Sequence, residues 1–505
     1  MSAKRTGKAK QQQSKLTSFS AQSFAVCVFA LAIGYSYRHY IYAVKAQGQV
    51  QSILDTCDVV KQGKFREQLL QYDGVGHFSI EEGESLLGEC AIRDTYQDAR
   101  LLFRKSAQEA GFELQSIAIH GDKYYTDVAV LHGHPRRFLI HVSGIHGVEG
   151  YAGSTAQVSA LNYFSQSAAK RRALYRQSTG PETAGLTSPP VAPTIVFVHA
   201  INPFGMANNR RVNEDNIDVN RNFLTDEQLK SVRARDPNFA GYVDIDFLLN
   251  PTYQVGTLFG SVWLNDLHGL LKVGYAVLAV GIGSIKRSLV AGNYYKPAGM
   301  GFGGFSRSQS VETLIRLGRE LKLDQAEKVV LIDVHTGLGP SGVDTLVYFG
   351  TENEQREAHM RRVFPLELAG DKVSTENSAS SDQIIGGIKE SSKGAGEGSA
   401  MAGYDLTVGT TDDYCREWMA PHLNEDNRIC VTQEFGTVGV IKVGKALMDE
   451  NYAFHHGSEM EKSVYGKRLR DCFFVHNTEW ARKVAHRGVK VIMEAFDVLA
   501  KKKNE

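Results

Sequence analysis

Apolar runs bounded by polar or turn residues mark the core of this chain. TIVFVHA (194–200), KVVLIDVH (328–335) and ICVTQEF (429–435) have the length of strands. Such runs are typical of strands buried at the centre of a sheet. Three further short strand candidates precede them at 113–119, 124–131 and 137–143.

The segments around these runs have helical patterns. Residues 95–112 place their apolar side chains on one face of a helix, and 150–175 and about 478–501 are also predicted to be helical. Strands that are interspersed with helices indicate an α/β domain that begins near residue 94. The apolar stretch 273–285 is too short to cross a bilayer, and we expect it to lie in the core.

The N-terminus combines basic residues with an apolar run. Residues 1–15 carry five Lys or Arg and no acid, and the run FAVCVFALAIGYSY follows at 24–37. Interfacial tyrosines and an arginine extend this run to Val44, near the length of about 20 residues that a membrane helix needs. We expect a signal-anchor with a cytoplasmic N-terminus; a cleaved signal peptide, a mitochondrial segment and a buried helix are the alternatives.

The chain is therefore predicted to have three parts: the basic and hydrophobic segment 1–46, a connector at 47–93, and an α/β domain at 94–505. The body is expected to be anchored to a membrane by a single pass or to enter the secretory pathway. Mitochondrial targeting remains the third localisation that this pattern allows.

Charge and cysteine usage give no support to nucleic-acid binding or to a structure built on cysteine clusters. The formal net charge is +1, so nothing in the overall balance indicates a nucleic-acid partner. The six cysteines are spread singly without a CxxC pair, which indicates neither a thiolate zinc cluster nor a disulfide scaffold. We expect them to be reduced structural thiols.

The spacing His-x-x-Glu offers two metal ligands, and the sequence contains it four times. Context favours His146 and Glu149, which follow a buried strand in a turn with several glycines. Ligands at the carboxyl end of a strand face the crevice where substrates bind in open α/β sheets. The other three pairs lie in polar or helical surroundings, where histidines are usually surface or capping residues.

A third ligand and a base are found where two other strands end. KVVLIDVHTGLGP places His335 between an apolar strand and a glycine turn, although alone it would be taken for a core histidine. Two histidines and a glutamate suit a hydrolytic zinc site with an open position for water. Glu434 ends the run ICVTQEF, and a carboxylate there is a candidate general base for that water.

One polar segment, residues 202–223, supplies the remaining candidates. Arg210, Arg211 and Arg221 could bind a carboxylate or stabilise an oxyanion; alternatively, the segment is a solvated loop whose charges cancel. Asp218 could orient a zinc-binding histidine. The chain lacks the GxSxG, P-loop and HExxH motifs, so serine-hydrolase, nucleotide-hydrolase and ordinary zincin functions have no motif to support them.

Several motifs in a fixed order resemble the zinc carboxypeptidase family. They are SGIHGVEGYAGS, HAINPFG, RRVNEDNIDVNRNF, IDVHTGLGP and EFGT. The resemblance runs from about Tyr96 to the end of the chain and is closest to a branch known only as a domain of unknown function. It implies a mixed, mostly eight-stranded sheet sandwiched between helices, with one Zn²⁺ per chain at the strand ends.

The resemblance also implies roles for single residues. His146, Glu149 and His335 match the metal ligands, and Glu434 matches the general base. Asp218 matches the partner of the first histidine.

On the substrate side, Asn220 and Arg221 match the pair that holds a terminal carboxylate. The arginine that polarises the scissile carbonyl matches Arg210 or Arg211, with Arg211 slightly favoured. Tyr414 stands at a plausible distance before the base for a substrate-side tyrosine, although its surroundings differ from those in digestive carboxypeptidases.

The function expected from these residues is zinc-dependent hydrolysis of an amide, most simply of a C-terminal peptide bond. The substrate would be a peptide or an acyl-amino acid with a free carboxylate. One alternative is a deacylase of N-acyl amino acids, which would prefer a single acylated residue to a peptide. Another is a membrane-tethered binding module without turnover, although such a module could have lost the ligands and base that are present here.

Overall fold

The computed structural model describes residues 91–177, 192–254, 262–348, 354–365, 388–390 and 407–500. The predicted segment 1–46 and nearly all of the connector at 47–93 lie outside these described residues, so the predictions made for them stay predictions.

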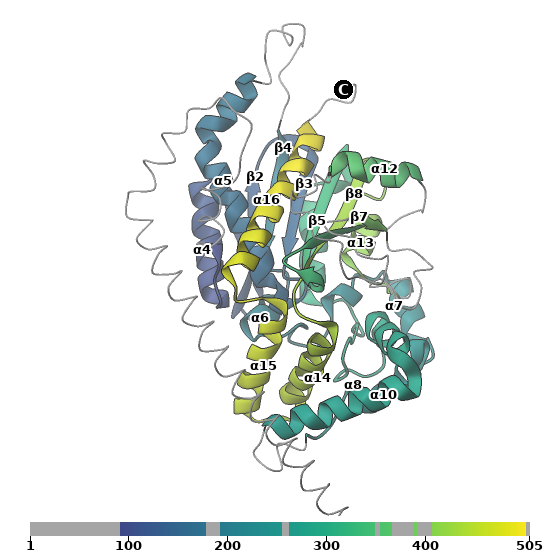
Figure 1. The fold of residues 1–505 in the computed structure, drawn as a ribbon. Coiled ribbons are helices and arrows are strands. Elements are labelled where there is room, and N and C mark those ends of the chain that lie inside the picture. Colours follow the sequence, from purple (N-terminus) through teal and green to yellow (C-terminus); the bar gives the residue numbers. More distant parts are fainter. Residues whose placement is uncertain are drawn as a thin grey trace, which may run out of the picture.

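An eight-stranded mixed sheet runs through the domain (Figure 1). Its strands are β1 (Glu113–Ile119), β2 (Tyr124–Leu131), β3 (His134–Ser143), β4 (Pro193–His199), β5 (Lys328–Ser341), β6 (Asp344–Tyr348), β7 (Ile388–Glu390) and β8 (Arg428–Gly436). Their order across the sheet is β1-β2-β4-β3-β5-β8-β6-β7. The central strands β4, β3, β5 and β8 are parallel, and antiparallel pairs flank them on both sides.

Helices cover both faces of the sheet. The α-helices of the described residues are α4 (Tyr96–Glu109), α5 (Gly150–Gln177), α6 (Pro203–Ala207), α7 (Asp226–Arg233), α8 (Asp246–Leu249), α10 (Val262–Ala291), α11 (Gln309–Glu320), α12 (Glu354–Val363), α13 (Thr411–Tyr414), α14 (Val440–His456), α15 (Glu459–Phe473) and α16 (Thr478–Ala500). Short turns of other helix types include η1 (Gly147–Glu149), η3 (Val219–Arg221) and the π-helix η8 (Cys415–Met419).

Alternation along β5 explains the two apolar layers. Val330 and Ile332 pack into one core cluster with residues of α4, α5 and α16. Val329 and Leu331 point to the opposite face and pack with residues of α11 and η8. Because successive side chains of a strand point to opposite faces, an apolar run without alternation is what a strand between two helical layers requires.

These observations confirm the predicted fold class, a mixed eight-stranded sheet sandwiched between helices. The predicted strands and the helices at 95–112, 150–175 and 478–501 are present with small shifts of their ends. The last two strands at one side of the sheet, β6 and β7, were not predicted, because five and three residues are too few to give a clear pattern.

The prediction that 273–285 lies in the core is confirmed for only one side of the stretch, where Ala276 is 1% exposed and lies in a core cluster with Val273, Val280 and Ile285 packed against it. This stretch belongs to α10, where the side chains of Tyr275 and Leu278 are 63% and 89% exposed. Within the described part of the chain, no single helix is long and apolar enough to cross a membrane. The segments Leu264–Gly281 and Gly283–Ala291 meet that test only as a pair, and a bend of 99° separates them.

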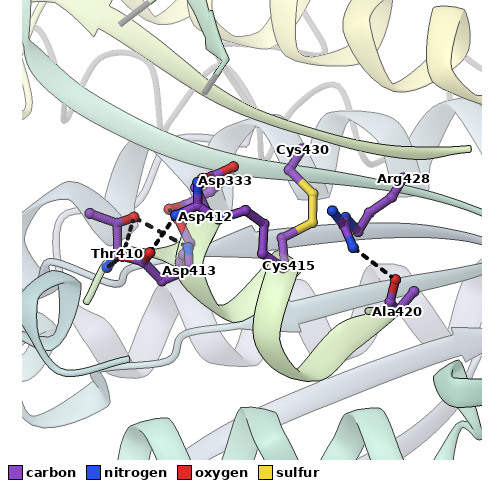
Figure 2. The surroundings of a disulfide bond; sticks show 10 residues. Asp333, Thr410, Asp412, Asp413, Cys415, Ala420, Arg428 and Cys430 are labelled. Carbon is purple, nitrogen blue, oxygen red and sulfur yellow. Dashed lines mark hydrogen bonds and ion pairs between the residues drawn. A yellow bond between two sulfur atoms is a disulfide. The ribbon is translucent and has the colours of Figure 1, made fainter. Parts of the chain in front are cut away.

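The expectation of six reduced thiols is also wrong for two of them. Cys415 of η8 and Cys430 of β8 form a disulfide (Figure 2). The bond joins residues 15 apart in sequence and fastens the segment after α13 to a central strand. A loop of this length corresponds to about 3 kcal/mol of stabilisation in the chain-entropy account. Cys472 is a buried free thiol, as expected.

The close approach of α5 to β3 gives a stability prediction. A Cβ added at Gly153 in α5 would lie 2.3 Å from Cβ of Ser143, so we expect Gly153→Ala to push the helix off the strand. The expected loss in the free energy of unfolding is about 1–3 kcal/mol. In α14, a Cβ at Gly444 meets nothing within 4 Å, and Gly444→Ala should raise stability by about 0.5–1 kcal/mol.

Urea denaturation followed by circular dichroism measures both changes. Equal effects of the two alanine substitutions would contradict the close packing of α5 on β3.

Candidate metal centre

The parallel register of three strands brings the candidate residues to one edge of the sheet. Ser143 at the end of β3 pairs with Val334 of β5, and the next residue of β5, His335, pairs with Glu434 of β8. The turn η1 follows β3 and carries Glu149. The carboxyl ends of the central strands therefore present the predicted ligands and base side by side.

Glycine allows the ligand turn to lie close to α6. A Cβ at Gly147 would lie 2.1 Å from the carbonyl carbon of Gly205, so only glycine fits without a backbone shift. The backbone N–H groups of Gly147 and Val148 donate to the carbonyl oxygens of Arg211 and Arg210, at 3.0 Å each. The turn with the ligands and the loop with the arginines thus hold one another in place.

The three predicted ligands meet in a buried cluster. Nδ1 of His146 lies 2.9 Å from Oε1 of Glu149, and Nδ1 of His335 lies 2.9 Å from Oε2 of the same carboxylate. The two Nδ1 atoms are 3.1 Å apart. Among the described residues, His146, Glu149 and His335 are the group of His, Cys, Asp and Glu whose ligand atoms converge closely enough to hold a metal ion.

This donor set fits a tetrahedral ion. Ligand atoms bound at about 2.0–2.1 Å from zinc lie roughly 3.3 Å apart, slightly more than the separations seen here. All three side chains are at most 5% exposed, and each offers an atom to the same point. A small outward shift of the side chains would therefore admit the ion, and water or substrate would complete its coordination.

Each histidine contacts a carboxylate through Nε2, the ring nitrogen that faces away from the ligand cluster. Nε2 of His146 faces Oδ1 of Asp218 at 3.1 Å, as the resemblance implied. Nε2 of His335 faces Oδ2 of Asp333 at 2.7 Å, a partner that the sequence analysis missed. Such carboxylates fix the ring orientation and leave the other nitrogen to the metal.

The signal for Asp333 is present in the sequence. Asp333 stands two residues before His335 on β5, and residues at this spacing point to the same face of a strand. Oδ2 of Asp333 also accepts a hydrogen bond from the hydroxyl of Thr411, at 2.6 Å. The carboxylate is fully buried, so these two contacts define its orientation.

The charges of the cluster shift its pKa values in opposite directions. Burial alone would lower the pKa of His335, but Asp333 and Glu149 raise it well above its usual value. Burial would raise the pKa of Asp218, but the charge of His146 and the two arginines Arg221 and Arg211 hold it well below its usual value. Glu149 is likewise held ionised against burial, chiefly by His146.

Glu434 lies beside the cluster but is not one of its ligands. Its Oε1 accepts a hydrogen bond from the backbone N–H of Leu338 at 2.9 Å, and the side chain is partly exposed. Removal from water, followed by the charge of Glu149, raises the pKa of Glu434 to about 7. A carboxylate with this pKa and some access to solvent suits a general base.

The two neighbouring arginines have different surroundings. Nη1 of Arg211 lies 2.8 Å from Oε1 of Glu149, so its guanidinium reaches the cluster. Arg210 is buried, forms an ion pair with Glu450 at 2.5 Å, and lies over the ring of Phe454. We therefore withdraw the catalytic role considered for Arg210, which holds the loop in place, and Arg211 stays the candidate that faces the site.

The predicted carboxylate anchors lie on η3, directly after Asp218. Oδ1 of Asn220 accepts a hydrogen bond from the backbone N–H of Thr411 at 3.0 Å. Arg221 donates through Nε to Val290 O at 2.8 Å and through Nη1 to Asn220 O at 2.7 Å. Both residues are therefore fixed within one short turn of the partner of His146, and their role towards substrate stays a prediction.

Tyr414 does not face the site. Its side chain is 1% exposed, packs against Phe223, and donates its hydroxyl to the carbonyl of Leu314 at 3.1 Å. A side chain enclosed in the core beneath the sheet cannot contact a substrate, so the substrate-binding role of Tyr414 is wrong. The residue of the same short helix that approaches the site is Thr411.

Comparisons with known proteins place the chain among uncharacterised relatives. The family described as "Protein of unknown function (DUF2817)" matches residues 93–176 and 182–487. No curated protein matches the chain.

The chain is similar to several solved structures, at low sequence identity and with low TM-scores. One from Shewanella amazonensis SB2B, described as a "putative metallopeptidase", is 12% identical with a TM-score of 0.31, and the match covers 72% of this chain and 92% of that one. Bovine thrombin-activatable fibrinolysis inhibitor, in complex with tick carboxypeptidase inhibitor, is 12% identical with a TM-score of 0.36 and coverage of 78% and 97%. A "putative carboxypeptidase A" from Shewanella denitrificans OS-217 is 11% identical with a TM-score of 0.35 and coverage of 78% and 70%. The residue assignments above rest on the geometry of the site and not on these likenesses.

The contact between Asp333 and His335 predicts a metal-affinity effect. Asp333→Asn removes the charge behind the histidine, so we expect the affinity for added Zn²⁺ to fall by about 10- to 100-fold. Thr411→Val removes one hydrogen bond to that carboxylate and should have a smaller effect in the same direction. Competition with a chelator measures both.

Thr407→Val is a matched control, because the hydroxyl of Thr407 bonds to Val290 O and not to the ligand cluster. An Asp333→Asn variant that folds normally and binds zinc as tightly as the wild type would contradict the role of Asp333.

Proposed function

The chain belongs to the family described as "Protein of unknown function (DUF2817)", and we propose that it is a zinc-dependent hydrolase that cleaves an amide bond next to a free carboxylate. The observation that carries this proposal is the convergence of His146, Glu149 and His335 with Glu434 beside them. Two histidines and one carboxylate with an open fourth position are the ligand set of hydrolytic zinc sites.

Zinc, when bound by these three residues, would supply Lewis acidity that polarises a carbonyl and makes a bound water more acidic. Glu434 is placed to accept the proton of the attacking water and to return it to the leaving nitrogen. Its raised pKa matches this task, because a base with a pKa near the working pH can both take and give a proton.

Arg211 is placed to stabilise the oxygen on which negative charge develops. Its guanidinium reaches the edge of the ligand cluster, where it contacts Glu149 in the present arrangement. A cation fixed near this oxygen stabilises the transition state more than the ground state. The ion pair with Glu149 and the contact with Asp218, at 3.6 Å, keep the guanidinium on this side of the loop.

Arg221 and Asn220 are the proposed anchors for the free carboxylate of the substrate. They follow Asp218 in one turn, so a carboxylate bound there would lie close to the ligand cluster. The contact between Asn220 and Thr411 connects this turn to Asp333 and therefore to His335. A C-terminal peptide bond is the simplest substrate for such an arrangement.

Metal content tests the site directly. We expect about one zinc per wild-type chain by elemental analysis, and loss of this zinc in His146→Ala and His335→Ala, since each removes one of three ligands. The protein is prepared with zinc in excess, and circular dichroism checks that each variant is folded. A folded wild type without metal under these conditions would sink the hydrolase proposal and favour a binding module.

Kinetics test the residues beside the metal. Glu434→Gln should keep its zinc and lose about 10²- to 10⁴-fold in kcat, and Arg211→Ala about 10²- to 10³-fold. Di- and tripeptides with free C-termini are assayed beside N-acyl amino acids, which separates a peptidase from a deacylase. Arg316→Ala, on the exposed side of α11, is the matched arginine control.

The pH dependence of kcat/KM tests whether Glu434 is the general base. Glu434 acts only when deprotonated, so kcat/KM should fall as the pH drops through its pKa. The positive charge of a bound metal lowers that pKa, so this fall should lie below pH 7. In Glu434→Gln the fall of kcat/KM at low pH should disappear. If the variant keeps residual activity and this activity still falls at the same pH, the base is another group.

A further inference from the structure

The longest helix of the domain exposes a continuous apolar face. Leu267, Leu270, Leu271, Tyr275 and Leu278 of α10 follow one another at the i, i+3, i+4 spacing of a single helix face. All are exposed, and Leu270 and Leu271 are 55% and 65% exposed. In a helix of a soluble domain, an apolar face of this kind normally packs into the core. Where it is exposed, it marks a site that contacts another apolar surface.

Neighbouring side chains widen this face. The ring of Phe247 in α8 lies against that of Tyr275, with centroids 5.9 Å apart, and Phe247 is itself exposed. Tyr253 stacks on His268 of α10 and is also exposed. We call these seven residues the α10 apolar face: Phe247, Tyr253, Leu267, Leu270, Leu271, Tyr275 and Leu278.

The charges on α10 favour an anionic partner. The helix sequence contains one acid, Asp266, and three basic residues of the Lys and Arg type. Asp266 is neutralised by ion pairs with Lys445 of α14 and Arg468 of α15, at 3.2 and 3.3 Å. On the arm before the bend, Lys272 lies over the ring of Tyr253 and adds a positive charge beside the α10 apolar face. A positive charge at this margin suits the phosphate headgroups of anionic lipids.

The shape of α10 allows its first arm to lie along a bilayer. Gly281 has a φ of 81°, and the helix bends by 99° beside it. The straight arm before the bend is about 27 Å long at 1.5 Å per residue. It packs on the domain through Asp266 and Asn265 and through Ala276, which lies in a core cluster. Apolar residues on one side, with aromatic rings and basic residues at the margin, are typical of helices in the membrane interface.

The beginning of the described chain contacts α15, a helix that lies at the same end of the molecule as α10 (Figure 1). Arg470 of α15 donates to the carbonyl of Asp94 at 3.0 Å, and Arg468 of the same helix pairs with Asp266 of α10. Figure 1 shows α15, α14 and α10 together at that end. The predicted signal-anchor at 1–46 would therefore enter the domain beside α10, and the 47–93 connector is long enough to let α10 reach the bilayer.

We propose that the α10 apolar face lies in the surface of a lipid bilayer that contains anionic lipids, and that it orients the domain on this bilayer. The predicted N-terminal anchor supplies the tether, and α10 supplies a second, interfacial contact. Two membrane contacts fix the orientation of a domain, which one flexible tether cannot do. This inference concerns a surface remote from the ligand cluster and does not depend on the proposed hydrolase activity.

A fluorescent label placed on α10 tests the contact. In the full-length chain Cys27, Cys57, Cys90 and Cys472 are replaced by serine, and Leu278→Cys supplies the one free thiol for the label NBD, since Cys415 and Cys430 are joined in the disulfide. It is reconstituted in vesicles of phosphatidylcholine and phosphatidylserine, with or without lipids that carry a quencher near the headgroup. We expect the label at 278 to be quenched by these lipids.

Leu101→Cys provides the matched control, because Leu101 of α4 is 68% exposed but lies on another part of the domain. A label there should stay unquenched. Adding Leu270→Glu and Leu271→Glu should abolish the quenching at 278, while Leu101→Glu should leave it unchanged.

Two results would overturn the proposal. If the chain floats with the vesicles but the label at 278 is not quenched, the N-terminal segment alone holds the protein. If the label is shielded from water without lipid quenching, and light scattering in detergent shows a dimer that Leu270→Glu and Leu271→Glu dissociate, a second copy covers this face.

Discussion

The parallel register of β3, β5 and β8 is the constraint on which the site depends. It places His335 of β5 beside the end of β3 and opposite Glu434 of β8. Residues that are almost 300 positions apart in sequence thereby become neighbours. Because a shift of one residue turns every side chain of a strand to the other face, the buried apolar runs also fix where the ligands point. The packing of the core and the geometry of the ligands are therefore one property of the fold.

This register concentrates acids in a place with little water. Glu149, Asp218, Asp333 and Glu434 all lie within or beside the cluster, whereas Arg211 and Arg221 are the arginines nearby. Buried carboxylates are stable only when cations or hydrogen bonds compensate them. A divalent ion held by His146, Glu149 and His335 would add the positive charge that this group of acids favours, and the same acids would keep both histidines oriented towards it.

The sequence could predict the residues whose signal is local. A histidine or glutamate at the end of an apolar run has a defined position as soon as the run is recognised as a central strand, and this identified His335 and Glu434. The choice between Arg210 and Arg211 depends on Glu450, which is 240 residues away. The pairing of Cys415 with Cys430 likewise depends on how η8 packs against β8, and spacing alone does not reveal it. Tyr414 was misassigned because distance along the chain says nothing about which face of α13 it occupies.

The error at 273–285 has a different cause, and it bears on the role that we propose for α10. Hydropathy reports that side chains avoid water, but it does not say whether protein or lipid replaces the water. In most domains protein is the only choice, and an apolar stretch is correctly assigned to the core. Here α10 is held on the domain by the ion pairs of Asp266 to α14 and α15 and by one apolar side that includes Ala276. A second apolar side of the same helix is left exposed. With this orientation the stretch fits the interfacial helix that we propose, and the N-terminal segment, if it is the predicted anchor, would bring α10 to a membrane.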